Sequence, residues 1–195
     1  GFVDVKEKLH MELVYKDLIL RSISEEDTDD ILKWRNSEHV RKYFIYQEEI
    51  KKEDHLNWLK NKVDAGRVIQ FMILKKEDRC PVGSVYLKDI DYANQKAEYG
   101  IFIGEENMTN HGIGSMAARC MIEYAFHHLN LHKLYLRVYE DNYRAISSYI
   151  KAGFKKVALL EDDVLVHGKF RNIILMGVVN KKECMNENII CNTLL

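Results

Sequence analysis

The chain has 195 residues, of which 47% are hydrophobic and 30% charged, and its formal net charge is -1. This length suits one domain with a sizeable core, and the near balance of 29 basic and 30 acidic residues excludes the basic surface typical of nucleic-acid binders. No apolar run approaches the roughly 18 residues of a membrane span. We therefore expect a single globular domain that acts in the cytoplasm and binds neither nucleic acid nor membrane.

The N-terminal third reads as a strand followed by two helices. We interpret residues 1–12, which are rich in charge, as a leader or flexible extension. Residues 13–23 alternate in polarity and are rich in Leu and Ile, so they predict a first strand. Ser24 and Asp27 then resemble a capping box at the start of a helix. A second helix is expected near residues 51–65.

The rest of the chain predicts a meander followed by alternating helices and strands. Short polar connections between three apolar runs are typical of antiparallel strands, at residues 68–76, 82–91 and 96–104. The expected elements that follow are a helix within 109–126, a strand at 133–139, a helix at 142–153, and strands at 154–161 and 171–179. We find no linker, so we expect one domain over residues 13–180 and a peripheral tail over 181–195.

Chemistry-bearing motifs are sparse outside this framework. The cysteines form no CxxC pair, and no His and Cys spacing suits zinc, so we expect no metal site. The segment TNHGIGS, residues 109–115, is more specific, because two glycines stand one residue apart at the start of a predicted helix. A helix start offers unpaired N–H groups and the positive end of the helix dipole, and glycine lets an anion approach the backbone. The segment is either an anion site or a plain turn.

A second motif follows one strand later. From Asn142 to Phe154 the chain reads N-x-x-A-x-x-x-Y-x-x-x-G-F. Asn142 can cap a helix, and Gly153 can end it. Tyr149 is either an ordinary packed tyrosine or a catalytic one.

With both motifs in this order, residues 18–179 resemble the GNAT superfamily of acetyl-CoA-dependent N-acetyltransferases. Thr109 departs from the Arg or Gln that usually opens the family's cofactor loop, but the main-chain donors of that loop remain. The resemblance implies an α/β fold, with a mixed, mostly antiparallel sheet of about seven strands flanked by about four helices. It also implies a splay between the strands at 98–103 and 134–139 that admits the cofactor.

The resemblance further assigns the acetyl-CoA contacts. The loop would bind the pyrophosphate through Thr109, Asn110, His111, Gly112, Ile113, Gly114 and Ser115. The strand edge at Phe102 and Ile103 would pair with the pantetheine amides, and Asn142 would touch the pantetheine arm. Tyr149 would protonate the departing thiolate.

The acceptor amine must lose a proton before it attacks the thioester. Glu98 is our candidate base, because an acid inside an otherwise apolar strand needs a partner or a chemical role. Burial would raise its pKa and make it a better base near neutral pH. The alternative is a structural ion pair. No cysteine stands at a motif position, so we expect direct attack.

Two elements in the N-terminal third indicate which class of amine is the acceptor. The WRN element at residues 34–36 and HLxWL at residues 55–59 are similar to the N-acetyltransferases of pseudaminic acid synthesis, which act on nucleotide-linked 4-amino sugars. Arg35, Asn36 and His55 are the candidate substrate-binding residues. The same region resembles, less specifically, ribosomal-protein N-terminal acetyltransferases. A polyamine acceptor, a non-catalytic acyl-CoA-binding module and a homodimer stay open.

Overall fold

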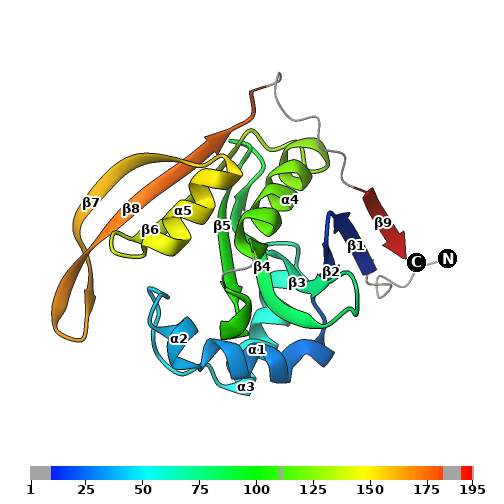
Figure 1. Ribbon diagram of the computed structural model, residues 1–195, viewed down its shortest axis with the longest axis horizontal. Helices are drawn as coiled ribbons and strands as arrows, with labels where there is room; N and C mark the ends of the chain where they lie inside the picture. The colour runs from blue at the N-terminus through cyan, green and yellow to red at the C-terminus, as the bar shows by residue number, and fades with distance from the viewer. Residues whose placement is uncertain (1–9, 110–111, 182–189, 195) are drawn as a thin grey trace.

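The computed structural model describes residues 10–109, 112–181 and 190–194 (Figure 1). Over these residues one sheet of nine strands has the order β7-β8-β6-β5-β4-β3-β2-β1-β9. The strands are β1 (His10–Tyr15), β2 (Leu18–Ser22), β3 (Ile69–Lys75), β4 (Pro81–Asp91), β5 (Lys96–Ile103), β6 (Lys133–Tyr139), β7 (Lys155–Val166), β8 (Lys169–Val179) and β9 (Ile190–Leu194). The helices are α1 (Thr28–Arg35), α2 (Glu38–Arg41), α3 (Lys52–Trp58), which continues as a π-helical turn over Leu59–Val63, α4 (Ile113–His127) and α5 (Tyr143–Ala152).

The predicted fold class is confirmed. Among the described strands β5 and β6 are parallel and the other neighbours are antiparallel, which gives a mixed, mostly antiparallel sheet. The meander predicted for residues 68–104 corresponds to β3, β4 and β5. None of the described helices is both long and apolar enough to cross a membrane.

The strand count differs from the prediction at both ends of the chain. The single strand expected at residues 13–23 is a hairpin, in which β1 and β2 meet through a two-residue turn at Lys16 and Asp17. Lys16 has φ 51, the left-handed backbone that two-residue hairpin turns use, but no glycine marks it in the sequence. Residues 10–12, expected in the extension, belong to β1, and β9 of the expected tail pairs with β1.

Successive strand residues point to opposite sides of the sheet, and in the central strand β3 both sides are buried. On β3, Phe71 and Ile73 belong to the core that α4 and α5 cover, whereas Met72 and Leu74 belong to the core beneath α1, α2 and α3. Figure 1 shows these two helix groups in different parts of the molecule. The sheet therefore separates two hydrophobic cores, each covered by its own group of helices.

The predicted splay is confirmed and lies between β5 and β6. Their parallel pairing covers only residues 96–98 of β5 and 133–135 of β6. Beyond Glu98, β5 continues beside β4 to Ile103, while β6 continues beside β8 to Tyr139. Each strand follows its antiparallel neighbour, so the sheet opens from Tyr99 onward.

Candidate active site

The cofactor loop leads into α4 through a left-handed residue. Gly112 has φ 71, a conformation that glycine adopts without steric cost, and its carbonyl accepts hydrogen bonds from the Met116 N–H and the Ser115 hydroxyl, both at 3.1 Å. The N–H groups of Ile113, Gly114 and Ser115 precede the first intrahelical donor. The helix therefore leaves these amides without intrahelical acceptors, as the predicted anion site requires. Asn110 and His111, which belong to the predicted site, lie outside the described residues.

Gly114 has a packing role that the sequence did not indicate. A Cβ atom at this position would lie 2.7 Å from the hydroxyl oxygen of Ser148 on α5. The missing side chain therefore lets α4 and α5 approach each other. Close packing is thus a reason for this glycine that is separate from the predicted close approach of a pyrophosphate.

Arg144 is a residue near the loop that sequence reasoning missed. Its Nη1 donates a hydrogen bond of 2.9 Å to the Thr109 hydroxyl, which in turn donates to the Glu106 carbonyl at 2.9 Å. The guanidinium thus stands beside the position where the family usually has Arg or Gln. A cation two residues after the capping Asn142 was the only signal in the sequence.

Along β5, the backbone N–H and C=O groups of alternate residues point away from β4, toward the open edge of the strand. The Gly104 N–H donates to the Val82 carbonyl at 2.7 Å, and the Phe102 carbonyl lies 2.3 Å from the Cβ position of Gly83, so both groups point toward β4. Because antiparallel strands alternate in this respect, the polar backbone groups of Ile101 and Ile103 face the splay. The geometry is compatible with the prediction for Ile103, whereas the Phe102 carbonyl is turned away from the open edge.

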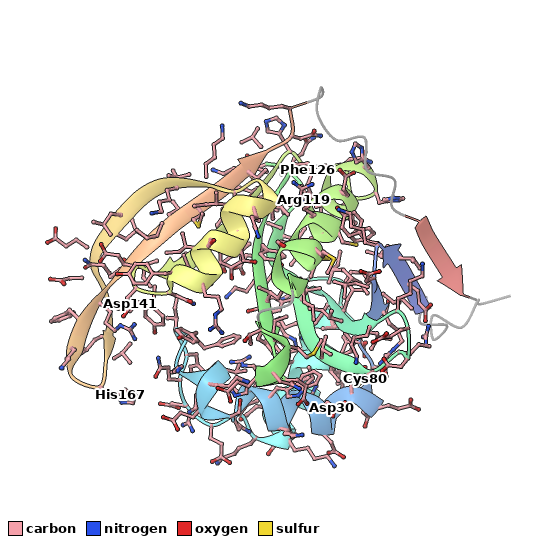
Figure 2. All side chains as sticks on the ribbon, viewed as in Figure 1. Asp30, Cys80, Arg119, Phe126, Asp141 and His167 are labelled. Carbon is pink, nitrogen blue, oxygen red and sulfur yellow. The ribbon has the colours of Figure 1, made fainter. Side chains whose placement is uncertain are left out.

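The helix α5 holds Tyr149 in place at both of its ends. Asn142 caps it as predicted, with the side-chain oxygen accepting from the Ala145 N–H at 3.4 Å. Asp141, labelled in Figure 2, lies just before the cap. It accepts a hydrogen bond of 2.9 Å from Arg171 of β8. At the other end Gly153 has φ 114, which turns the chain so that the Phe154 N–H can donate to the Tyr149 carbonyl at 3.0 Å.

The Tyr149 ring is fixed by two aromatic neighbours. It packs edge-on against Tyr99 with centroids 6.1 Å apart, and against Phe154 at 5.9 Å. Burial, followed by the proximity of Tyr86, raises the pKa of the Tyr149 hydroxyl well above its ordinary value. The raised pKa keeps the hydroxyl protonated. It makes no hydrogen bond to the residues that the structure describes, so it is available as a donor.

Glu98 lies in an ion-pair network. One oxygen of its buried carboxylate accepts a hydrogen bond of 2.7 Å from Arg137 Nε, and the other lies 3.1 Å from Lys88 Nζ. Burial alone would raise the pKa of Glu98, but the bond from Arg137 and the charge of Lys88 outweigh it and lower that pKa. The expectation that burial makes this carboxyl more basic is therefore wrong, because the sequence did not reveal the two cations.

The Arg35 guanidinium forms no ion pair with a carboxylate of the described residues, and its Nε is buried without a hydrogen-bond partner. The guanidinium carbon lies 3.7 Å from the ring centroid of Phe44 and 5.8 Å from that of Phe102. Burial lowers its pKa, and the nearby phenols of Tyr86 and Tyr46 act in the opposite direction.

The other two predicted substrate residues differ from each other. Asn36 is engaged within the chain, since its amide donates to the Ile50 carbonyl at 2.9 Å and accepts from the Ile50 N–H at 2.7 Å. His55 is buried, and its Nε2 has no hydrogen-bond partner. Burial first, and then the positive charge of Arg35, lower the pKa of His55 and keep it neutral. Trp34, expected in the core, is 2% exposed.

Comparison with known proteins settles the family. The acetyltransferase (GNAT) domain family matches residues 17–155. The chain belongs to this family. It is accordingly an acetyl-CoA-dependent N-acetyltransferase.

Among its relatives are polyamine-modifying enzymes. It is 26% identical to spermidine N(1)-acetyltransferase of Vibrio cholerae over 165 residues, and this alignment covers 85% of this chain and 94% of that protein. It is 36% identical over 96 residues to spermidine N(1)-acetyltransferase of Escherichia coli, over 49% of this chain and 51% of that protein. The crystal structure of the Vibrio cholerae enzyme in complex with CoA and spermine has a TM-score of 0.78 at 22% identity, over 84% of this chain and 96% of the other.

Proposed function

We propose that this enzyme transfers the acetyl group of acetyl-CoA to the primary amine of a small acceptor by direct attack. The observation that carries the proposal is the opening between β5 and β6, with the free amides at the start of α4 at one end and the unbonded Tyr149 hydroxyl beside it. The amides would hold the pyrophosphate, and the backbone edge at Ile101 and Ile103 would hold the pantetheine arm. This arrangement directs the thioester into the splay.

In the proposed reaction the amine nitrogen attacks the thioester carbonyl carbon. The new C–N bond forms as the C–S bond breaks, and the leaving thiolate takes a proton from Tyr149. The surplus proton on nitrogen passes to Glu98 or to water. Lys88 and Arg137 stabilise the ionised form of Glu98, which makes this carboxylate a weaker base. Water therefore competes with Glu98 for the amine proton more strongly than the sequence suggested.

For the acceptor, similarity to known enzymes supports a polyamine, which is the first amine to test. The relatives from Vibrio cholerae and Escherichia coli are both named spermidine N(1)-acetyltransferase, and the Vibrio cholerae complex contains spermine. One relative from Vibrio cholerae is described as a dodecamer, so an oligomer of this chain is also part of the proposal.

A second candidate acceptor is an amine that carries an anionic group, such as a nucleotide-linked 4-amino sugar. Arg35 favours it, because a half-buried cation with no carboxylate partner among the described residues attracts an anion and repels a polycation. The unpartnered Nε2 of buried His55, in the electrostatic field of Arg35, is a further hydrogen-bonding position for such a ligand.

The deciding experiment measures coenzyme A release with three acceptors: spermidine, a UDP-4-amino-4,6-dideoxy sugar and a ribosomal N-terminal peptide. The largest kcat/KM identifies the acceptor class. A far higher value for spermidine than for the sugar rejects the second candidate and gives Arg35 a structural role. Tight acetyl-CoA binding with no release from any amine would reject the proposed reaction in favour of an acyl-CoA-binding module.

A further inference from the structure

Tyr86 fills a space that Gly100 leaves open. The two residues are register partners on β4 and β5. A Cβ atom on Gly100 would lie 2.2 Å from Cζ of Tyr86 and 2.4 Å from its hydroxyl oxygen. The phenol end therefore lies directly over the backbone of β5, where any other residue would place its side chain.

This position is the mouth of the splay. Glu98 is the last residue of β5 that pairs with β6, and Gly100 comes two residues later. Tyr86 packs against the hydrophobic cluster that contains Trp34 and Phe102, on the side of α1, α2 and α3. Tyr149 belongs to the other side of the sheet. The two phenols thus flank β5 from opposite faces just where the sheet opens.

The Tyr86 hydroxyl has unused hydrogen-bonding capacity. It makes no hydrogen bond to any residue in the described part of the chain, although its ring is half-buried. Burial raises its pKa, against the effect of Lys88 and Arg35, so the hydroxyl is neutral at physiological pH. A neutral hydroxyl offers one donor and two acceptor lone pairs. It can therefore accept an N–H bond from an amine.

We propose that Tyr86 binds and orients the attacking amine, which it holds through an N–H to hydroxyl-oxygen bond on the face of β5 opposite Tyr149. This inference rests on the proposed acetyl transfer, whichever amine is the acceptor. The amine would enter from the side of α1, α2 and α3, and its lone pair would point across the splay toward the thioester carbonyl carbon. Tyr86 exchanges no proton in this step. Gly100 is then a specificity-determining position, because a side chain there would displace the phenol.

The test is Tyr86→Phe, which keeps the ring over Gly100 and removes only the hydroxyl. We expect kcat/KM for the acceptor to fall roughly 10- to 100-fold, as for a lost hydrogen bond to a charged or polarised partner, while KM for acetyl-CoA and the melting temperature stay unchanged. Gly100→Ala, which displaces the phenol but retains the hydroxyl, should lose acceptor kcat/KM as well. Tyr92→Phe, at a tyrosine that is 57% exposed in the β4–β5 turn, is the control and should match the wild type.

The assay uses the amine that the wild type acetylates fastest among spermidine, the UDP-linked sugar and the peptide. An acceptor kcat/KM of Tyr86→Phe equal to that of the wild type would overturn the assignment. Equal losses in acetyl-CoA and acceptor parameters would also overturn it, because they would indicate disturbed packing. If the wild type acetylates none of the three amines, the proposed function fails, and the Tyr86 assignment falls with it.

Discussion

The two faces of β5 differ in the kind of group that each offers to a ligand. On the face of α4 and α5, which we call the cofactor face, the groups that we propose for acetyl-CoA are mostly backbone: the first amides of α4 and the free strand edge at Ile101 and Ile103. On the face of α1, α2 and α3, which we call the acceptor face, the groups that we propose for the acceptor are side chains, namely Arg35, His55 and Tyr86. A cofactor common to a family is held by groups that survive substitution, whereas acceptor choice depends on side chains that a single substitution can change.

The largest effect should come from removing the proposed acid of the cofactor face, the Tyr149 hydroxyl. Tyr149→Phe retains the packing against Tyr99 and Phe154, so the fold should persist. Turnover should fall roughly 10- to 1000-fold, with acetyl-CoA affinity little changed. Steady-state kinetics and calorimetry measure the two quantities. Wild-type turnover would make Tyr149 a packing residue and leave the cofactor face without its acid.

The next test separates the two reasons for Gly114. Gly114→Val should weaken acetyl-CoA binding at least tenfold, about 1.4 kcal/mol, but it would also press on Ser148. Gly114→Ala in a Ser148→Ala background relieves that contact, because the nearest Ser148 atom is then Cβ at 3.7 Å. If the pyrophosphate needs the space, calorimetric affinity stays low in the double variant. Full recovery of affinity would show that the glycine serves helix packing alone.

On the acceptor face, Arg35→Gln distinguishes the two acceptor classes. If the acceptor carries an anion, its KM should rise about tenfold, in line with the loss of a charge-assisted hydrogen bond. If the acceptor is a polyamine, its KM should stay the same or fall. Lys33→Gln is the matched control, because it removes a positive charge from a side chain that is 72% exposed on the same helix. A rise in KM in the control as well would indicate a diffuse electrostatic effect.

The smallest kinetic effect concerns Glu98. Glu98→Gln breaks the network with Lys88 and Arg137 and should cost about 1.5–3 kcal/mol of stability near neutral pH. The native pKa of Glu98 is lowered, so the unfolded chain binds the proton first, and wild-type stability is lost as pH falls below the ordinary value of 4.5. The variant should lack this component of the pH dependence.

Rate measurements on the same variant test the role of Glu98 as a base. If Glu98 is only an ion pair, the rate per folded molecule stays near that of the wild type. If it accepts the amine proton, the rate is low at pH 7 and partly recovers at higher pH, where free amine is common. Denaturant unfolding across pH and kinetics across pH together separate the two outcomes.

The cofactor face was largely predictable because its signals are local. Gly112 in a left-handed turn, Asn142 as a cap and Gly153 at a helix end each act within a few residues of the chain. Their spacing therefore reveals the loop and α5 directly. The hairpin turn at Lys16 was missed because a lysine in the left-handed region carries no sequence signature.

The acceptor face was less predictable because its contacts join distant segments. Arg137 reaches Glu98 across 39 positions of the chain, and this contact reverses the pKa shift inferred from burial alone. Tyr86 and Gly100 become meaningful only when the β4–β5 register sets them opposite each other. The sequence suggested that Asn36 is free to bind a ligand, whereas the structure shows its amide in two hydrogen bonds with the Ile50 backbone.

The central claim is that an amine brought in from one face of β5 attacks a thioester held from the other, without an acetyl-enzyme intermediate. Rapid-quench kinetics with enzyme preloaded with labelled acetyl-CoA tests it most directly. The account predicts no coenzyme A release before acceptor is added, and afterwards coenzyme A and acetylated amine appearing at the same rate. A burst of coenzyme A equal to the enzyme concentration in the absence of acceptor, with the label retained on the protein, would contradict it.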